Sequence, residues 1–99
     1  MLESVTLATF AGRLGETFRA HAAEGHPLVV ELIEATDLSG GKPPPDRRAP
    51  FSIVLRGPPA PWLPQQIYRL EHDELGAFDL FIVPIGPDAH GMRYEAVFG

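Results

Sequence analysis

The sequence predicts a mainly β domain with one short N-terminal helix, built as a small antiparallel β-barrel or sandwich of about six strands. Three observations favour this fold class. Several segments alternate apolar and polar residues, whereas only one segment spaces its apolar residues as a helix does. The chain contains 10 Gly and 11 Pro, which is typical of short strands joined by turns. Its length of 99 residues predicts a single β-rich domain spanning residues 1–99.

The segment with helical spacing covers residues 6–15. Its apolar residues recur at positions i, i+3, i+4 and i+7, namely Leu7, Phe10, Ala11 and Leu14. Thr6 is a candidate N-cap and Gly15 a candidate residue C′, just beyond the helix. A helix this short is unstable without tertiary contacts, so we expect its apolar stripe to close one end of a β core.

Alternation is clearest between residues 67 and 83, where two apolar-rich arms flank a polar connection. The connection begins at His72 and is followed by Gly76, which predicts an antiparallel hairpin. One face of the hairpin is mostly apolar and holds Tyr68, Leu70 and His72 on the first arm, with Phe78, Leu80 and Ile82 on the second. Pro84 is expected to end the second arm.

The remaining strands are expected within residues 16–23, 28–36, 51–56 and 92–98. The strand at 28–36 carries apolar residues on both faces, so we expect it to be central or to be covered by the helix. The strand at 92–98 follows the hairpin directly, which predicts a meander of three consecutive strands.

Two proline-rich segments, at residues 39–50 and 57–64, are expected to be exposed loops. Loops of this kind often carry binding residues, and a last strand at a sheet edge could pair with another chain. The residues that we therefore expect to bind a partner are Trp62, Leu63, Arg47, Arg48 and Phe98. The alternative is that Trp62 caps the core and that the prolines only stiffen the loop.

The charge balance argues against nucleic acid or an anionic membrane as a partner. The formal net charge is −5, the isoelectric point is near 5.2, and only 8 Lys and Arg are present. The absence of cysteine excludes a disulfide, a thiolate zinc site and a cysteine nucleophile. The chain begins without a basic signal-peptide region and has no run of about 20 apolar residues, so we expect a cytoplasmic protein.

Few residues are placed to carry chemistry. His21 and His26, with Glu24 between them, could bind a metal, but zinc sites use three or four ligands, which favours a solvated turn. The ionisable cluster from Glu71 to Glu74 lies where the hairpin turns, so we expect it to be solvated as well. No serine lies in a G-x-S-x-G elbow: the three are Ser4, Ser39 and Ser52. We predict no catalytic residue, no metal ligand and no cofactor.

Four segments of the chain also support a family resemblance. They read TLATFAGRLGETF at 6–18, FSIVLRGP at 51–58, QQIYRLEHDELGAFDLFIVPIG at 65–86 and YEAVF at 94–98. Together they resemble a bacterial family of small proteins of this length, described as a domain of unknown function. The resemblance covers most of the chain apart from the 37–50 loop and implies no activity. The resemblance implies an accessory or assembly role, because the genes of such proteins look like neighbours of genes for phage-tail-collar-like proteins.

The leading hypothesis is a non-enzymatic protein–protein interaction or assembly module, accessory to a phage-tail-like or surface structure. Its expected partner is a protein, and a homo-oligomer is compatible with the sequence. The alternative is a small enzyme or a ligand-binding barrel that uses His72 or His90 with neighbouring carboxylates and Tyr68.

Overall fold

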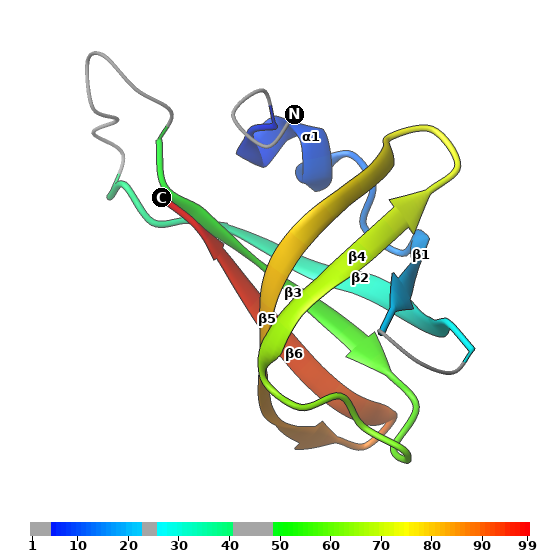
Figure 1. Cartoon of the computed structure of the whole chain (residues 1–99). Helices are drawn as coiled ribbons and strands as arrows, with labels where there is room; N and C mark the ends of the chain where they lie inside the picture. The colour runs from blue at the N-terminus through cyan, green and yellow to red at the C-terminus, as the bar shows by residue number, and fades with distance from the viewer. Residues whose placement is uncertain (1–4, 23–25, 41–48) are drawn as a thin grey trace.

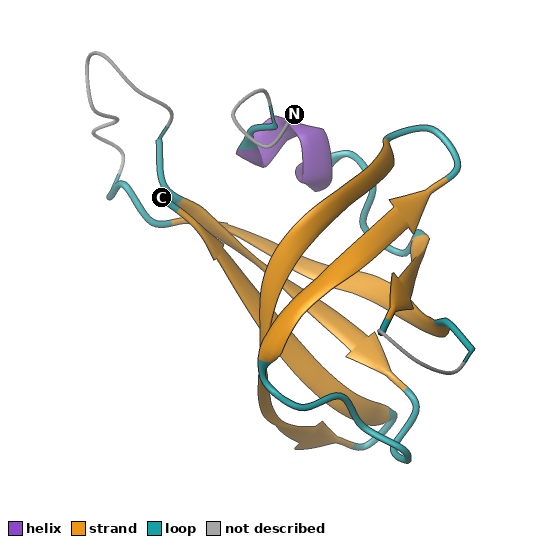
Figure 2. Ribbon diagram, viewed as in Figure 1, coloured by secondary structure: helices purple, strands orange, loops and turns teal. Residues whose placement is uncertain are grey.

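The structure, a computed structural model, describes residues 5–22, 26–40 and 49–99 and is shown in Figures 1 and 2. The short helix α1 spans Leu7–Ala11. Six strands follow it in the chain: β1 (Thr17–His21), β2 (Leu28–Asp37), β3 (Phe51–Gly57), β4 (Gln66–His72), β5 (Gly76–Asp88) and β6 (Gly91–Phe98). The prediction of a mainly β chain with one short N-terminal helix is therefore confirmed. In the described part of the chain, no helix has the length and apolar character needed to cross a membrane.

The six strands form a closed antiparallel barrel. Around the barrel their order is β1-β2-β3-β6-β5-β4, and β4 pairs with β1 to complete the ring. The meander predicted for the last three strands is confirmed, since β4 pairs with β5 and β5 with β6. Closure decides between the two architectures that the sequence left open, in favour of the barrel over the sandwich.

Alternate side chains of each strand fill the inside of the barrel. The inward face predicted for the hairpin is confirmed, because its six side chains are all buried: Tyr68, Leu70, His72, Phe78, Leu80 and Ile82. Ile53 and Leu55 of β3 and Tyr94 and Ala96 of β6 belong to the same core cluster. A six-stranded barrel is narrow enough for side chains to pack its interior fully.

Helix α1 is shorter than the periodicity predicts. Thr6 is the N-cap, as expected, and its N–H donates to Thr9 Oγ1 at 3.0 Å. The helix ends at Ala11 with Gly12 as its C-cap, and Leu14 is 53% exposed, so the prediction that Leu14 faces the core is wrong. Gly12 has a low helix propensity, which favours termination one turn early.

Gly15 does not follow the helix directly as a C′ residue. It has a φ of +89° in the turn that leads into β1, and its N–H donates to the Leu32 carbonyl oxygen at 2.8 Å. This turn therefore anchors the chain between α1 and β1 against strand β2.

Strand β5 is longer than predicted, because it continues past Pro84 to Asp88. Strand β4 begins at Gln66, opposite Ile82, so β5 beyond Ile82 has a neighbour on the β6 side alone. A proline amide that faces away from β6 is then not needed for a ladder hydrogen bond. A register shift between Pro84 and Gly86 accommodates the prolines further.

Candidate functional site

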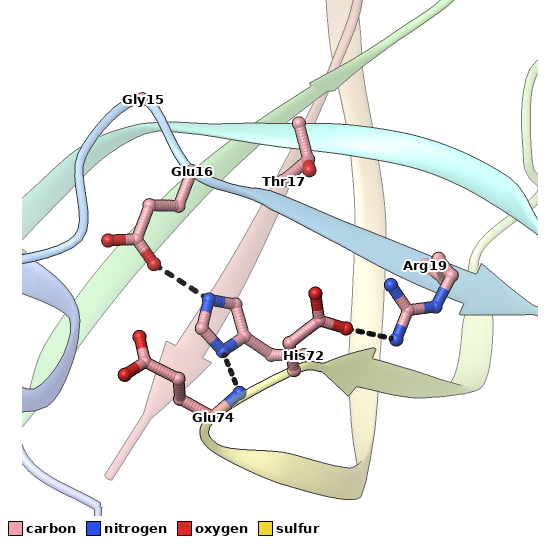
Figure 3. Close-up of a pocket in the computed structure, with 7 residues that line it drawn as sticks. Gly15, Glu16, Thr17, Arg19, His72 and Glu74 are labelled. Atoms are coloured by element: carbon pink, nitrogen blue, oxygen red, sulfur yellow. Dashed lines mark hydrogen bonds and ion pairs between the residues drawn. The ribbon is translucent and has the colours of Figure 1, made fainter.

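A polar depression lies where the α1–β1 connection meets the β4–β5 turn. Its volume is about 320 Å³. Figure 3 shows the residues that line it: Gly15, Glu16, Thr17, Arg19, His72, Asp73 and Glu74. Glu16, from the α1–β1 connection, and Glu74, from the turn, lie on two sides of the His72 ring, and Arg19 of β1 is directed toward the turn. Among the sequence candidates it contains His72 and its neighbouring carboxylates.

His72 is the central side chain of this depression and is 6% exposed. Its Nε2 lies 2.7 Å from Glu16 Oε1. Its Nδ1 accepts hydrogen bonds from the N–H groups of Glu74 at 3.0 Å and Leu75 at 3.1 Å. Because Nδ1 accepts two backbone amides, the ring proton is on Nε2 and is donated to the Glu16 carboxylate. The expectation that the 71–74 cluster is solvated is therefore wrong for His72.

Arginine side chains neutralise the carboxylates around His72. Arg13 Nη1 lies 2.8 Å from Glu74 Oε1 and 3.3 Å from Glu16 Oε1. Arg19 binds Asp73 Oδ1 at 3.0 Å and Glu71 Oε1 at 3.2 Å. These ion pairs link the α1–β1 connection and β1 to the turn that follows β4.

Hydrogen bonding also fixes the protonation of two of these acids. The hydrogen bond from His72 lowers the pKa of Glu16, and the ion pair with Arg13 adds to this against the effect of desolvation. The pKa of Glu71 is lowered first by its hydrogen bond with His21 and then by Arg19. Both groups are carboxylates at neutral pH, so they accept hydrogen bonds and carry no proton that a general acid could donate.

The other catalytic candidates lie elsewhere in the barrel. His90 follows the far end of β5, where its N–H donates to Asp88 Oδ1 at 2.8 Å. The Tyr68 hydroxyl points to the 57–64 loop and donates to the Pro64 carbonyl oxygen at 2.5 Å. The structure therefore does not bring Tyr68, His72 and His90 together.

The histidines weighed as metal ligands are His21 and His26. His21 Nε2 lies 3.0 Å from Glu71 Oε1, and His26 is exposed. Glu24 lies outside the described residues. Over residues 5–22, 26–40 and 49–99, no three His, Asp or Glu side chains are grouped as metal ligands.

The two predicted binding residues of the proline-rich loop after β3 differ in their exposure. Trp62 is 53% exposed, whereas Leu63 is partly buried against the core. Tyr94 fixes this loop from inside the barrel, because its hydroxyl accepts a hydrogen bond from the Leu63 N–H at 2.8 Å. Burial raises the pKa of both Tyr94 and Tyr68. Leu63 thus caps the core, and Trp62 projects from a fixed loop.

The other predicted binding residues are placed differently. Phe98 is 4% exposed and stacks on Phe51 with ring centroids 4.4 Å apart. Strand β6 pairs with β3 as far as Phe98 and with β5 as far as Glu95, so the last strand is part of the closed barrel. Arg47 and Arg48 lie outside the described residues.

An apolar groove on the barrel wall is a site that the sequence reasoning missed. We call it the β5–β6 groove; its volume is about 380 Å³, and its lining includes Ile67, Asp79, Leu80, Phe81, Val97 and Phe98. Ile67, Phe81 and Val97 are 65%, 49% and 59% exposed. Each occupies an outward position of its strand, where a barrel wall usually carries polar residues. Apolar residues at these outward positions were the signal that could have identified the groove.

Comparison with known protein families gives a match over nearly the whole chain. The family model of DUF6916, a domain of unknown function, matches residues 5–98, in agreement with the resemblance of the four segments. No curated protein and no solved structure matches the chain.

Proposed function

We propose that this chain, which belongs to the DUF6916 family of domains of unknown function, is a non-enzymatic protein–protein interaction module. The observation that carries the proposal is the exposed apolar surface around the β5–β6 groove. Ile67 and Phe81 are directly opposite each other on β4 and β5, and Val97 faces the groove from β6. Three neighbouring large apolar side chains on outward positions are typical of a surface that a partner covers.

Covering this surface is energetically favourable. Burial of apolar area contributes about 25 cal/mol for each Å², so side chains as exposed as Ile67 and Val97 gain most from a partner. Trp62, at 53% exposure on its fixed loop, supplies a second anchor of the type found at the centre of interfaces.

The polar depression supports an interaction module over an enzyme. Both ring nitrogens of His72 are engaged, one by Glu16 and the other by two backbone amides. A general base must have a free lone pair within reach of its substrate. The role that fits this geometry is to hold the β4–β5 turn against the connection that precedes β1.

We extend the proposal to an accessory role in a phage-tail-like or surface structure. The support for this finer statement is the family resemblance of the segments at 6–18, 51–58, 65–86 and 94–98. The groove supports assembly in general and does not select this structure.

A matched pair of variants tests the interaction function. Val97 in the groove and Val29 on the outer side of β2 are both exposed valines on strands, at 59% and 56%. Val97→Thr and Val29→Thr keep the size and the β propensity of the side chain. Each protein is immobilised on beads and incubated with native lysate, and the retained proteins are quantified by mass spectrometry. Size exclusion with light scattering gives the oligomeric state of each variant.

We expect the wild type and Val29→Thr to retain the same partner and Val97→Thr to retain less of it. A chain that stays monomeric and retains no protein above the bead control would overturn the proposed function.

A further inference from the structure

The wall of the barrel divides between β5 and β6. The two strands pair from Asp88 opposite Gly91 as far as Val83 opposite Glu95. Before Val83, β5 pairs with β4, and after Glu95, β6 pairs with β3. Figure 1 shows the hairpin of β4 and β5 diverging from the C-terminal end of β6. The β5–β6 groove occupies this division.

Phe10 of α1 holds the division apart from the inside. Its ring centroid lies 6.2 Å from that of Phe78 on β5 and 5.4 Å from that of Phe98 on β6. Phe10 is fully buried, so the division is a packed part of the fold. The groove is therefore formed before any partner arrives, which lowers the conformational cost of binding.

The shape of the groove fits an extended chain. Leu80 and Phe98, both nearly buried, line its floor, and Phe81 and Val97 stand at its two sides on β5 and β6. A strand placed along the groove would direct every second side chain toward this floor. Recognition of an extended segment beside a strand of the host sheet is a recurrent binding mode.

Two acidic side chains lie at the groove. Asp79 lines it, and Glu95 lies where β5 and β6 meet, opposite Val83. Asp79 has an exposed ion pair with Arg69 at 3.6 Å, and exposed pairs of this kind contribute little energy, so a cation of a partner can replace Arg69 at low cost. Glu95 has no ion pair with another described residue, and Arg93 on the same strand donates to the Gly86 carbonyl oxygen.

A second copy of the chain is a poorer complement to this surface than a basic partner. Each copy has a formal net charge of −5, which opposes the approach of two copies. Lysine or arginine beside apolar residues complements both the floor and the rim.

Building on the proposed function, we infer that the β5–β6 groove binds an extended segment of a partner protein that carries apolar side chains at alternate positions and lysine or arginine at its flanks. This segment lies between β5 and β6 where those strands diverge, with its apolar side chains on Leu80 and Phe98 and its cations near Asp79 and Glu95.

A displayed library of random peptides of about ten residues, a length that spans a typical strand, tests the inference. Selection uses the immobilised wild-type chain. We expect the enriched peptides to alternate apolar residues, to carry Lys or Arg, and to exclude proline from their centres. Enrichment of acidic or proline-rich peptides, or of none, would overturn the inference.

Affinities of one enriched peptide for matched variants locate the contact. We expect Val97→Thr to weaken binding by about tenfold, as loss of an interface anchor does, and Val29→Thr to leave it unchanged. Asp79→Asn and Glu95→Gln should each weaken binding by a few-fold and reduce its dependence on salt. Far-ultraviolet circular dichroism on every variant confirms that the fold is intact. Equal affinity for the wild type and Val97→Thr would overturn the inference.

Two further outcomes separate this inference from the proposed function. A concentration-dependent dimer of the wild type that Val97→Thr abolishes would assign the groove to a second copy and overturn the inference. A lysate partner that Val97→Thr retains in full would also overturn it, while the interaction function would still hold. Retention of no partner and selection of no peptide would overturn both.

Discussion

The Tyr94 hydroxyl accepts a hydrogen bond from the Leu63 N–H at 2.8 Å, which joins the interior of the barrel to the loop that carries Trp62. Tyr68, on β4, reaches the same loop and donates to the Pro64 carbonyl oxygen. Both tyrosine rings are nearly buried, so the two hydroxyls act from fixed positions. The loop lies outside the sheet, yet the core determines its shape at these two points.

Tyr94→Phe is expected to destabilise the protein and to change the surroundings of Trp62. The substitution leaves the Leu63 N–H without its partner, which should lower the free energy of unfolding by about 1–2 kcal/mol. Trp62 is the one tryptophan of the sequence, so its fluorescence reports the loop directly. Urea unfolding followed by circular dichroism gives the stability, and the native emission spectrum gives the loop response. Unchanged emission in both Tyr94→Phe and Tyr68→Phe would show that the loop is held in another way.

The strand pattern explains how much of the fold the sequence predicts. On the two arms of the segment 67–83, apolar side chains recur at every second position apart from His72, and this pattern identifies the inward face of β4 and β5. The continuation of β5 past Pro84 depends on which neighbour the strand has there, and a single strand does not contain that information. The periodicity also predicted a longer helix than the structure has, because Gly12 ends α1 one turn before the last apolar residue of the pattern.

The candidate sites were less predictable because they depend on tertiary geometry. The alternation of β4 places His72 inward, as the structure has it, whereas the acidic residues beside it suggested a solvated turn. The buried position is possible because Glu16 reaches the ring from a distant segment. The β5–β6 groove depends on where two strands diverge and on the register that brings Val97 near Phe81. The exposed apolar residues Ile67, Phe81 and Val97 were a signal in the sequence, but their position beside one another depends on the tertiary fold.

His72→Asn is expected to be less destabilising than His72→Ala. Alanine removes the acceptor for the backbone amides of Glu74 and Leu75, which should cost about 1–3 kcal/mol in the free energy of unfolding. Asparagine keeps a side-chain oxygen at the position from which Asx turns form, although it cannot reach Glu16. Urea unfolding at neutral pH measures both variants. Equal losses would show that packing of the ring on Phe18, at 4.7 Å between centroids, matters more than the amides.

Glu16 is expected to make the protein sensitive to acid. Its pKa in the folded protein lies below the ordinary value of 4.5, chiefly because of the hydrogen bond from His72. A lowered pKa means that the folded state favours the carboxylate, so this stabilisation is complete above pH 4.5 and is lost as the pH falls through the folded pKa. Urea unfolding across that range should show a shallower pH dependence for Glu16→Gln than for the wild type.

Glu34→Gln is the matched control for this measurement, because Glu34 is an exposed strand glutamate without an ion pair to another described residue. Its pH dependence should match that of the wild type. If Glu16→Gln also matched the wild type, the link between Glu16 and His72 would contribute nothing to acid stability.

Phe10→Ala is expected to be the most destabilising of these substitutions and to alter the β5–β6 groove. Phe10 is fully buried and its ring contacts Phe18, Phe51, Phe78 and Phe98. Replacing a buried phenylalanine with alanine costs about 3–5 kcal/mol, from lost burial and from the cavity that remains. Leu14→Ala is the control, because Leu14 has the same helical spacing but is exposed, and it should change stability by less than about 0.5 kcal/mol. Amide chemical shifts of Leu80 and Val97 in the folded fraction should move in Phe10→Ala alone, since the ring separates the strands that carry them. Equal stability of the two variants would contradict the burial of the Phe10 ring among the aromatic side chains of the core.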